Sequence, residues 1–386
     1  MRLRRCAHLL IEPRERLEFD LALLAGGGDG LCKPVDLVAL APHLAGEVVV
    51  SPAEAAVAMA ASPTDWRPYD AFEADAVVVE ALRAKALFVV EGSDMDARDR
   101  LLRDTHWRAV AAANHYASRW SDIDTEAAQE RLAEITHDSL LDRLGPSPPP
   151  VRERTPPSLR RKLTVPAPSA IDALLDHRVT CRNFDRARAL TQEQLSAVLY
   201  RAYGARVVHD YAPGVQLLKK GVPSAGALHP TEAYLLVQHV DGVDPGLYHY
   251  HPVDHALEPI RAMDAEEAAS TARRFVAAQG YFVDAHVMVM PTTRFRRTFW
   301  KYRNHAKAYR AVILDVGHLS QTTYLAATEL GLGAFITAAI NEVDIEHAFG
   351  LDPLEEGPLA VTGFGVRGAE RNEIEFDPLN AIWPAS

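Results

Sequence analysis

Arg178, Thr180 and Arg182 occupy alternate positions in one short segment. In extended backbone, residues two apart project from the same face, so the three side chains would stand together. Two guanidinium groups and a hydroxyl fit a phosphate dianion, because each guanidinium can donate paired hydrogen bonds to its oxygens. Sulfate or a carboxylate would fit almost as well, and a solvated basic edge strand is the structural alternative. The segment predicts an anion site, with Cys181 on the opposite face as a packing residue.

A second segment, residues 222–230, combines small residues with two bracketing prolines. Its first small side chains are those of Pro223, Ser224, Ala225 and Gly226, which leave the backbone most exposed. A flat ligand could lie directly against such a backbone, because almost no side chain stands in the way. The segment leads into the strand-like residues 233–237, which favours a loop held rigid by a scaffold. An ordinary tight turn before a strand is the alternative.

Together these segments resemble the nitroreductase-like FMN flavoprotein superfamily. The resemblance is stronger to its branch of azoline-oxidising dehydrogenases, which mature ribosomally made peptides. A third matching element, Gly-Leu-Tyr-x-Tyr-x-Pro, occupies residues 246–252. The resemblance covers residues 165 to 370 and implies an α+β fold of nitroreductase type, a central mixed or antiparallel sheet flanked by helices.

The resemblance also assigns an FMN cofactor to residues in four segments. They are Arg178, Thr180 and Arg182 for the phosphate, Pro223, Ser224, Ala225 and Gly226 for the isoalloxazine face, Gly333 and Ala334 for its edge, and Arg367 as a further cation for the phosphate. The turn before Gly333 has a second explanation, because Gly331 suits the C-cap of a preceding helix.

Lys301 and Tyr302 match a lysine–tyrosine pair of azoline dehydrogenases. Oxidising an azoline to an azole removes a proton from one ring carbon and a hydride from its neighbour, so a base must stand beside the cofactor. Tyr302 could be that base if Lys301, Arg297 or Arg303 lowers its pKa. Adjacent helical residues diverge by about 100°, so the pair can share a pocket only at a helix start or in a loop. A cationic helix end anchored by both residues is the alternative.

His249, His251 and His255 lie close together, which raises the question of a metal. The first two have strand spacing on a predicted hairpin, without a His-Glu-x-x-His motif or a carboxylate at ligand spacing. The sequence therefore predicts no metal site.

Composition narrows the classes of partner. The 386 residues are 48% hydrophobic, enough for two domains with sizeable cores, and the net charge of −11 disfavours nucleic acid as the main partner. No window holds eighteen apolar residues without charge, so no membrane span is expected. The basic start is soon interrupted by acidic residues, unlike a signal peptide. The three cysteines lack CxxC spacing and are expected to be reduced thiols of a cytoplasmic protein.

Prolines divide the chain into predicted domains. Residues 145–168 hold the densest run of them and predict an extended linker between an N-terminal module, residues 1–144, and an FMN-binding domain, residues 169–386. The linker arginines are either simply solvated or meet an acidic leader peptide or the other domain.

The N-terminal module has the outline of a winged helix. Ser51, Pro52 and Glu54 predict a helix start, a second helix is expected over residues 75–86, and a strand over residues 87–92. Relatives often carry such a module to capture the leader of a precursor peptide. DNA binding lacks the necessary basic recognition helix, whereas a purely structural appendage remains open.

The remaining elements are mostly helical. One or two charged helices are expected over residues 97–143, and others over residues 191–200, 264–278 and 309–330. A buried strand is expected over residues 284–290.

These observations favour an FMN-dependent dehydrogenase that turns azolines of a ribosomal peptide into azoles, with dioxygen regenerating the flavin. A related two-electron desaturation would use the same site. The expected partners are the precursor peptide, a second copy of the chain in a homodimer, and a cyclodehydratase or other modifying enzyme. The alternatives are an NAD(P)H-dependent nitro or quinone reductase and a non-catalytic scaffold.

Overall fold

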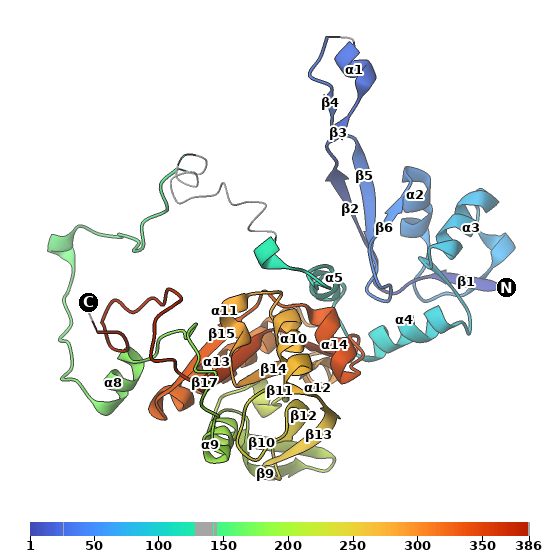
Figure 1. The fold of residues 1–386 in the computed structure, drawn as a ribbon. Helices are drawn as coiled ribbons and strands as arrows, with labels where there is room; N and C mark the ends of the chain where they lie inside the picture. The colour runs from blue at the N-terminus through green and yellow to red at the C-terminus, as the bar shows by residue number, and fades with distance from the viewer. Residues whose placement is uncertain (26, 128–141, 143–144, 385–386) are drawn as a thin grey trace.

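The computed structural model describes the chain except for residues 26, 128–141, 143–144 and 385–386 (Figure 1). An N-terminal part, blue to cyan in Figure 1, and a C-terminal part, green to red, are joined by extended chain. Residues 145–169 contain a single short helical turn, Pro157–Leu159. Among the described helices, none has the length and apolar character needed to span a membrane.

An antiparallel sheet forms the centre of the C-terminal part. Its strands lie in the order β13 (Ala256–Ala262), β12 (Gly246–His251), β11 (Thr231–Val237), β14 (Val287–Arg294), β17 (Val361–Val366) and β15 (Leu332–Thr337), with β16 (Glu356–Pro358) paired to β14. Neighbouring named strands of this sheet are antiparallel. The predicted central sheet is therefore confirmed, in its antiparallel form.

Helices cover both faces of this sheet. They are α8 (Ala170–Asp176), α9 (Gln192–Ala202), α10 (Ala265–Phe275), α11 (Gly280–Val283), α12 (Phe295–Phe299), α13 (Ala308–Glu329) and α14 (Glu342–Phe349). Leu235 packs with residues of α9 and α13, whereas its neighbour Leu236 packs with residues of α10 and α14. Successive strand residues point to opposite faces, so the two helix layers lie on opposite sides.

Local signals explain where the predicted helices begin. Thr191 caps α9 through a capping box with Gln194, and Asp264 accepts the Glu267 N–H at the start of α10. After the C-terminal end of α13, Gly331 adopts φ +71°, the left-handed conformation expected after a helix. The helices over residues 191–200, 264–278 and 309–330 are confirmed within three residues at each end.

The N-terminal part contains the predicted helix, helix and strand. These are α2 (Pro52–Ala60), α3 (Ala76–Ala84) and β8 (Phe88–Val90), and α2 starts at a capping box between Ser51 and Glu54. The other elements are β1 (Arg2–Arg5), β2 (Leu10–Glu15), β3 (Glu18–Phe19), α1 (Leu21–Ala25), β4 (Leu31–Cys32), β5 (Val35–Leu40), β6 (Val48–Val50) and β7 (Arg67–Pro68). The strands form the sheets β7-β1-β8, β2-β5-β6 and β3-β4, of which only strand β8 was predicted.

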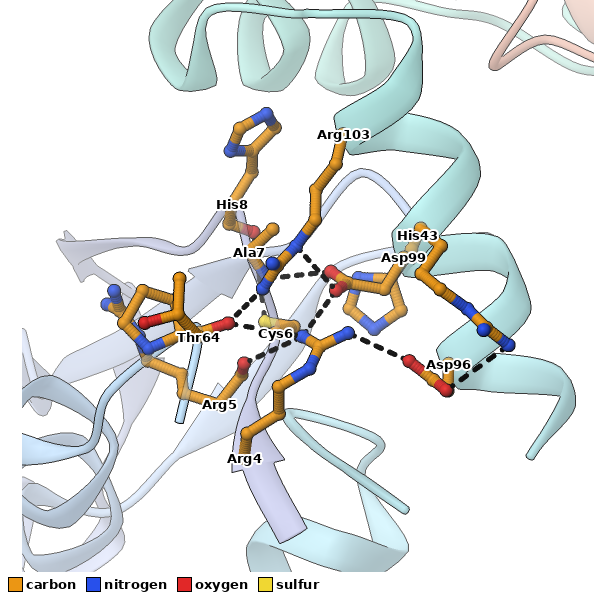
Figure 2. A network of polar contacts seen from close by, with 12 residues as sticks. Arg4, Arg5, Cys6, Ala7, His8, His43, Thr64, Asp96, Asp99 and Arg103 are labelled. Atoms are coloured by element: carbon orange, nitrogen blue, oxygen red, sulfur yellow. Dashed lines mark hydrogen bonds and ion pairs between the residues drawn. The ribbon is translucent and has the colours of Figure 1, made fainter. Parts of the chain in front are cut away.

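A buried ionic network fixes the next helix, α4 (Asp94–Asp104), to β1 (Figure 2). The Arg4 guanidinium lies 2.8 Å from Asp96 and 2.5 Å from Asp99, and all three side chains are buried. Asp99 also accepts the Ala7 N–H at 2.6 Å. Removing one partner would leave an unpaired buried charge, so the network holds α4 firmly to the module.

Helix α4 and helix α5 (Ala109–Ala117) carry the chain onto the C-terminal part. Both helices fall largely within the charged segment predicted over residues 97–143, of which residues 128–141 and 143 lie outside the description. Trp107, between the helices, is fully buried and donates its indole N–H to the Leu354 carbonyl at 3.2 Å. Its ring centroid lies 4.4 Å from that of Phe295 and 4.8 Å from that of Phe299. Trp107, and through it the segment between α4 and α5, therefore supports α12.

A projecting hairpin, β9 (Ala205–Ala212) and β10 (Val215–Lys220), was not predicted. Its strand β9 is almost wholly exposed, Tyr211 at 69%. The hairpin leads directly into the loop of residues 222–230.

Candidate functional site

The first group of predicted site residues gathers beside β15. Thr180 forms a bridge with Ala334, whose carbonyl accepts the Cys181 N–H at 2.9 Å. The Thr180 and Tyr324 hydroxyls lie 3.0 Å apart, and the Arg178 guanidinium stands over the Tyr324 ring. We call Arg178, Thr180, Gly333, Ala334 and Arg367 the anion group.

The two arginines of this group differ in their partners. Arg367 is paired with Glu375 at 2.8 Å and donates to the Val179 carbonyl at 2.7 Å. Arg178 has neither a carboxylate partner nor a side-chain hydrogen bond within the described residues. The Arg178 guanidinium therefore has N–H donors that could bind an anion, whereas the Arg367 guanidinium already neutralises the buried Glu375 carboxylate.

Arg182 does not join the other two members of the predicted anion segment. Its guanidinium donates to the Ile374 carbonyl at 3.0 Å and lies over the Tyr281 ring, whereas Arg178 and Thr180 both contact Tyr324. The structure thus places Arg178 and Thr180 together and Arg182 beside the C-terminal tail.

Cys181 has the packing environment predicted for it. The side chain is buried, and burial raises the pKa of its thiol to about 12. A β-carbon on Gly333 would collide with the Cys181 sulfur, which explains a glycine at that position in structural terms. The close approach joins β15 to the segment that carries Arg178 and Thr180.

The second group lies around the bare loop. Residues 225–227 form one short helical turn, and Gly226 adopts φ +65°. A β-carbon on Gly226 would lie 2.8 Å from Lys301 Nζ and 2.8 Å from the Tyr302 hydroxyl oxygen. We call residues 223–226 with Lys301 and Tyr302 the loop group. The structure thus joins two segments about seventy-five residues apart that were singled out separately.

Lys301 and Tyr302 lie in the turn that follows α12. Both backbone N–H groups point to the Thr298 carbonyl, at 3.2 and 3.1 Å, and the Lys301 ammonium lies 5.6 Å from the Tyr302 ring centroid. Adjacent side chains can share a pocket only in a loop or at a helix start, and the turn after α12 is such a place.

Asp315 anchors the loop and was not anticipated from the sequence. This buried carboxylate of α13 accepts the Ser224 hydroxyl at 2.5 Å and the Ala225 N–H at 3.3 Å, and burial raises its pKa. Ser224 also accepts the His229 N–H at 3.0 Å. The Ser224 side chain is thereby used inside the protein, so a ligand on this loop would meet mainly backbone.

Two signals could have identified the missed positioning residues. Asp315 is a lone carboxylate in the apolar run of residues 311–316, and a buried acid without a function there would be costly. Trp107 is a large apolar residue that follows a charged helix. Neither signal names the partner, since Asp315 bonds a loop ninety residues upstream and Trp107 packs about 190 residues downstream.

A pocket of about 410 Å³ opens beside the loop group. Its lining is Tyr211, Ala212, Val215, Leu217, Gly226, Leu228, Trp300 and Lys301. Arg297 joins two of its walls by donating to the Leu228 carbonyl at 3.0 Å and to the carbonyl of Gln216, between Val215 and Leu217, at 2.6 Å. These walls are mainly apolar and aromatic, with Lys301 supplying the charge, which suits flat heterocyclic rings.

Helix α13 separates the two groups. Asp315 holds the loop group and Tyr324 contacts the anion group, nine positions later. Nine helical residues advance about 14 Å and turn through about two and a half turns, so the two side chains leave α13 on opposite faces.

The three clustered histidines have partners within the protein. His249 lies 2.6 Å from Glu258, His251 lies 3.1 Å from Asp254, and His255 lies between the Ser196 and Tyr250 hydroxyls. Among the described residues, no group of three or more His, Cys, Asp or Glu side chains could hold a metal ion.

The part of the chain that carries both groups is similar to known proteins. The model of the nitroreductase family matches residues 175–366. The putative nitroreductase MJ1384 of Methanocaldococcus jannaschii is 32% identical over 176 residues, which cover 46% of this chain and 81% of that protein. Trifolitoxin-processing protein TfxB of Rhizobium leguminosarum bv. trifolii is 34% identical over 167 residues, 42% of this chain and 43% of that protein. The chain thus spans less than half of the length of TfxB.

The fold has a counterpart of known structure. It is a chain of the E. coli microcin synthetase McbBCD complex with truncated pro-MccB17 bound, with a TM-score of 0.51 and 20% identity, covering 69% of this chain and 97% of that chain. The match at this identity concerns the fold. The family model and the relative from M. jannaschii show that the chain belongs to the nitroreductase family.

Proposed function

We propose that the chain is an FMN-dependent dehydrogenase that oxidises azoline rings of a ribosomally made peptide to azoles. Similarity to a trifolitoxin-processing protein supports a peptide substrate. The observation that carries the proposal is the convergence of Lys301 and Tyr302 on the bare Gly226 backbone. A cation, a proton acceptor and exposed backbone at one pocket are what the oxidation of a flat heterocycle needs.

The residues present fit an FMN group. Arg178 is free of carboxylates in the described structure, beside the Thr180 hydroxyl, and could hold a phosphate. The loop of residues 223–226 offers backbone to a ring system, and Gly333 with Ala334 lies in the strand next to Thr180. When bound, FMN would supply the two-electron acceptor for the substrate hydride.

The protein's part in the reaction is to remove a proton. Tyr302 would take the proton from the ring carbon onto its hydroxyl oxygen, for which it must first be a phenolate. The Lys301 ammonium beside it would stabilise that phenolate. Trp107, packed on α12, would keep the turn that carries both side chains in place.

A homodimer would allow the anion group and the loop group to contact the same cofactor. They leave α13 on opposite faces, so a single cofactor would reach both only if a second copy contributed one of them. The N-terminal half of α13 exposes Ile313 at 51% and Leu314 at 58%, and a β-carbon on Gly317 would have no atom within 4 Å. These residues would allow close contact with another helix, so we propose this face as the contact between copies.

The function can be tested with one synthetic peptide that carries a thiazoline. Mixed without oxygen, the FMN-loaded protein should lose its flavin absorbance, and the peptide should lose two hydrogens by mass. NADPH with a nitroaromatic acceptor is the comparison. Rapid NADPH oxidation together with an unchanged peptide would support the nitro or quinone reductase instead.

The two arginines of the anion group should behave differently when replaced by alanine. Arg178→Ala should lose most of its retained FMN at an unchanged unfolding midpoint, because its guanidinium has no protein carboxylate to serve. Arg367→Ala should destabilise the fold by about 3 kcal/mol, since it leaves the buried Glu375 without its cation. Flavin content after gel filtration and chemical denaturation separate the two. Equal FMN loss without destabilisation in both variants would contradict this distinction.

A further inference from the structure

A strongly basic segment borders the pocket beside the loop group. Residues 294–310 contain seven arginine and lysine residues and no acidic residue, although the chain as a whole has a net charge of −11. The segment includes α12 and the turn before α13. Charge of one sign concentrated at the mouth of a pocket attracts ligands of the opposite sign.

Part of this charge is already used inside the protein. Arg294 pairs with Glu232 at 2.7 Å, and Arg297 donates to backbone carbonyls. Apart from Lys301 of the loop group, four exposed cations of the segment lack a carboxylate partner in the part of the chain that the structure describes. They are Arg296, Arg303, Lys307 and Arg310, which we call the basic rim.

The rim is placed for substrate rather than for the cofactor phosphate. Arg303 donates to the carbonyl of Trp300, a residue of the pocket wall, at 3.1 Å. Arg310 lies fourteen positions before Tyr324 on α13, about 21 Å along the helix from the contact point of the anion group.

Positive charge also acts on the loop itself. Burial, followed by Lys220, Lys219 and Arg297, lowers the pKa of the His229 imidazole to about 4. His229 belongs to the loop that Asp315 anchors, since its N–H donates to the Ser224 hydroxyl oxygen and that hydroxyl donates to Asp315. The three cations, unlike the burial, would stabilise a carboxylate that approaches this loop.

We propose that the basic rim docks acidic residues of the substrate peptide, which flank the ring that enters the Tyr211 and Trp300 pocket. This inference rests on the proposed function and adds to it a class of substrate: peptides with carboxylates next to the reacting heterocycle. The complementarity would raise the association rate and select such peptides from neutral ones.

The test uses two fluorescent peptides that each carry one thiazole, the stable product ring. Three aspartates flank the ring on each side in one peptide, and asparagines replace them in the other. By anisotropy at low salt, the FMN-loaded protein should bind the aspartate peptide about tenfold more tightly, and added salt should reduce this preference. Arg303→Glu with Lys307→Glu should bring the two affinities within about twofold of each other.

Arg274→Glu is the matched control. It reverses an exposed cation of α10, a helix on the other face of the central sheet, and should keep the full preference. Equal affinities of the two peptides for the unchanged protein would overturn the inference. So would a rim variant that keeps the preference, or one that weakens binding of NADPH or single-stranded DNA but not of the aspartate peptide.

A second measurement separates this inference from the proposed function. The thiazoline forms of both peptides are mixed with the protein without oxygen, and flavin absorbance is followed. If both bleach the flavin at equal peptide affinity, the function stands and the docking inference fails. If only the aspartate peptide binds through the rim and neither bleaches the flavin, the docking stands and the azoline oxidation fails.

Discussion

Replacing Tyr302 with phenylalanine is expected to stop the oxidation of a thiazoline peptide while FMN remains bound. The substitution removes only the hydroxyl that stands 2.8 Å from the site of a β-carbon on Gly226, and the ring can still pack against the Trp107 cluster. Loss of a general base lowers the rate by about 10² to 10⁴ fold. The measurement is the rate at which the peptide loses two hydrogens, together with the flavin content of the protein.

Two companion variants sharpen this expectation. Tyr309→Phe removes a hydroxyl in the same aromatic cluster, but that hydroxyl bonds His115 at 2.9 Å, so the rate should change little. Lys301→Met should also lower the oxidation rate while FMN stays bound, because it removes the ammonium that lies 5.6 Å from the Tyr302 ring centroid. A Tyr302→Phe protein that oxidises the peptide at the original rate would refute the assignment of the base.

Elements defined by local chemistry were predictable from the sequence. The capping boxes at Ser51 and Thr191 fix helix starts through contacts three residues apart, which a sequence displays directly. Gly331 marked the end of α13 for the same reason. The anion segment and the bare loop are equally local patterns, so the order of residues along the chain is enough to find both.

Elements that depend on distant partners were not predictable in this way. Strand β9 is exposed along its length, so it lacks the alternation of apolar and polar residues that reveals a half-buried strand. The sheets β2-β5-β6 and β3-β4 consist of short strands with mixed burial. Pairing with neighbours, rather than the local sequence, decides such strands.

The same distinction applies within the site. Alternate spacing suggested that Arg178, Thr180 and Arg182 share one target, yet Arg182 turns to the C-terminal tail. Glu375 of that tail accepts the Arg182 N–H at 2.6 Å and pairs with Arg367. A carboxylate about 190 residues away thus sets how this segment is arranged, and spacing along the chain carries no information about it.

Gly226→Ala should lower the oxidation rate by about a hundredfold with the fold intact. The added β-carbon would stand too close to Lys301 Nζ and to the Tyr302 hydroxyl, so both flexible ends must move away from the loop. A displacement of about 1 Å at a reacting group can reduce a rate by this factor. Alanine at φ +65° also costs about 1 kcal/mol of stability, which must be separated from the effect on the rate.

Gly350→Ala is the control that separates the loss of stability from the loss of rate. Gly350 ends α14 at φ +66°, nearly the value at Gly226, and a β-carbon there would have no atom within 4 Å. The two variants should therefore show similar losses in unfolding midpoint, whereas only Gly226→Ala should lose activity. If both retained the original rate, the contact of Gly226 with Lys301 and Tyr302 would have no part in catalysis. If both lost it equally, backbone strain would explain the loss, and the convergence on which the proposed function rests would lose its support.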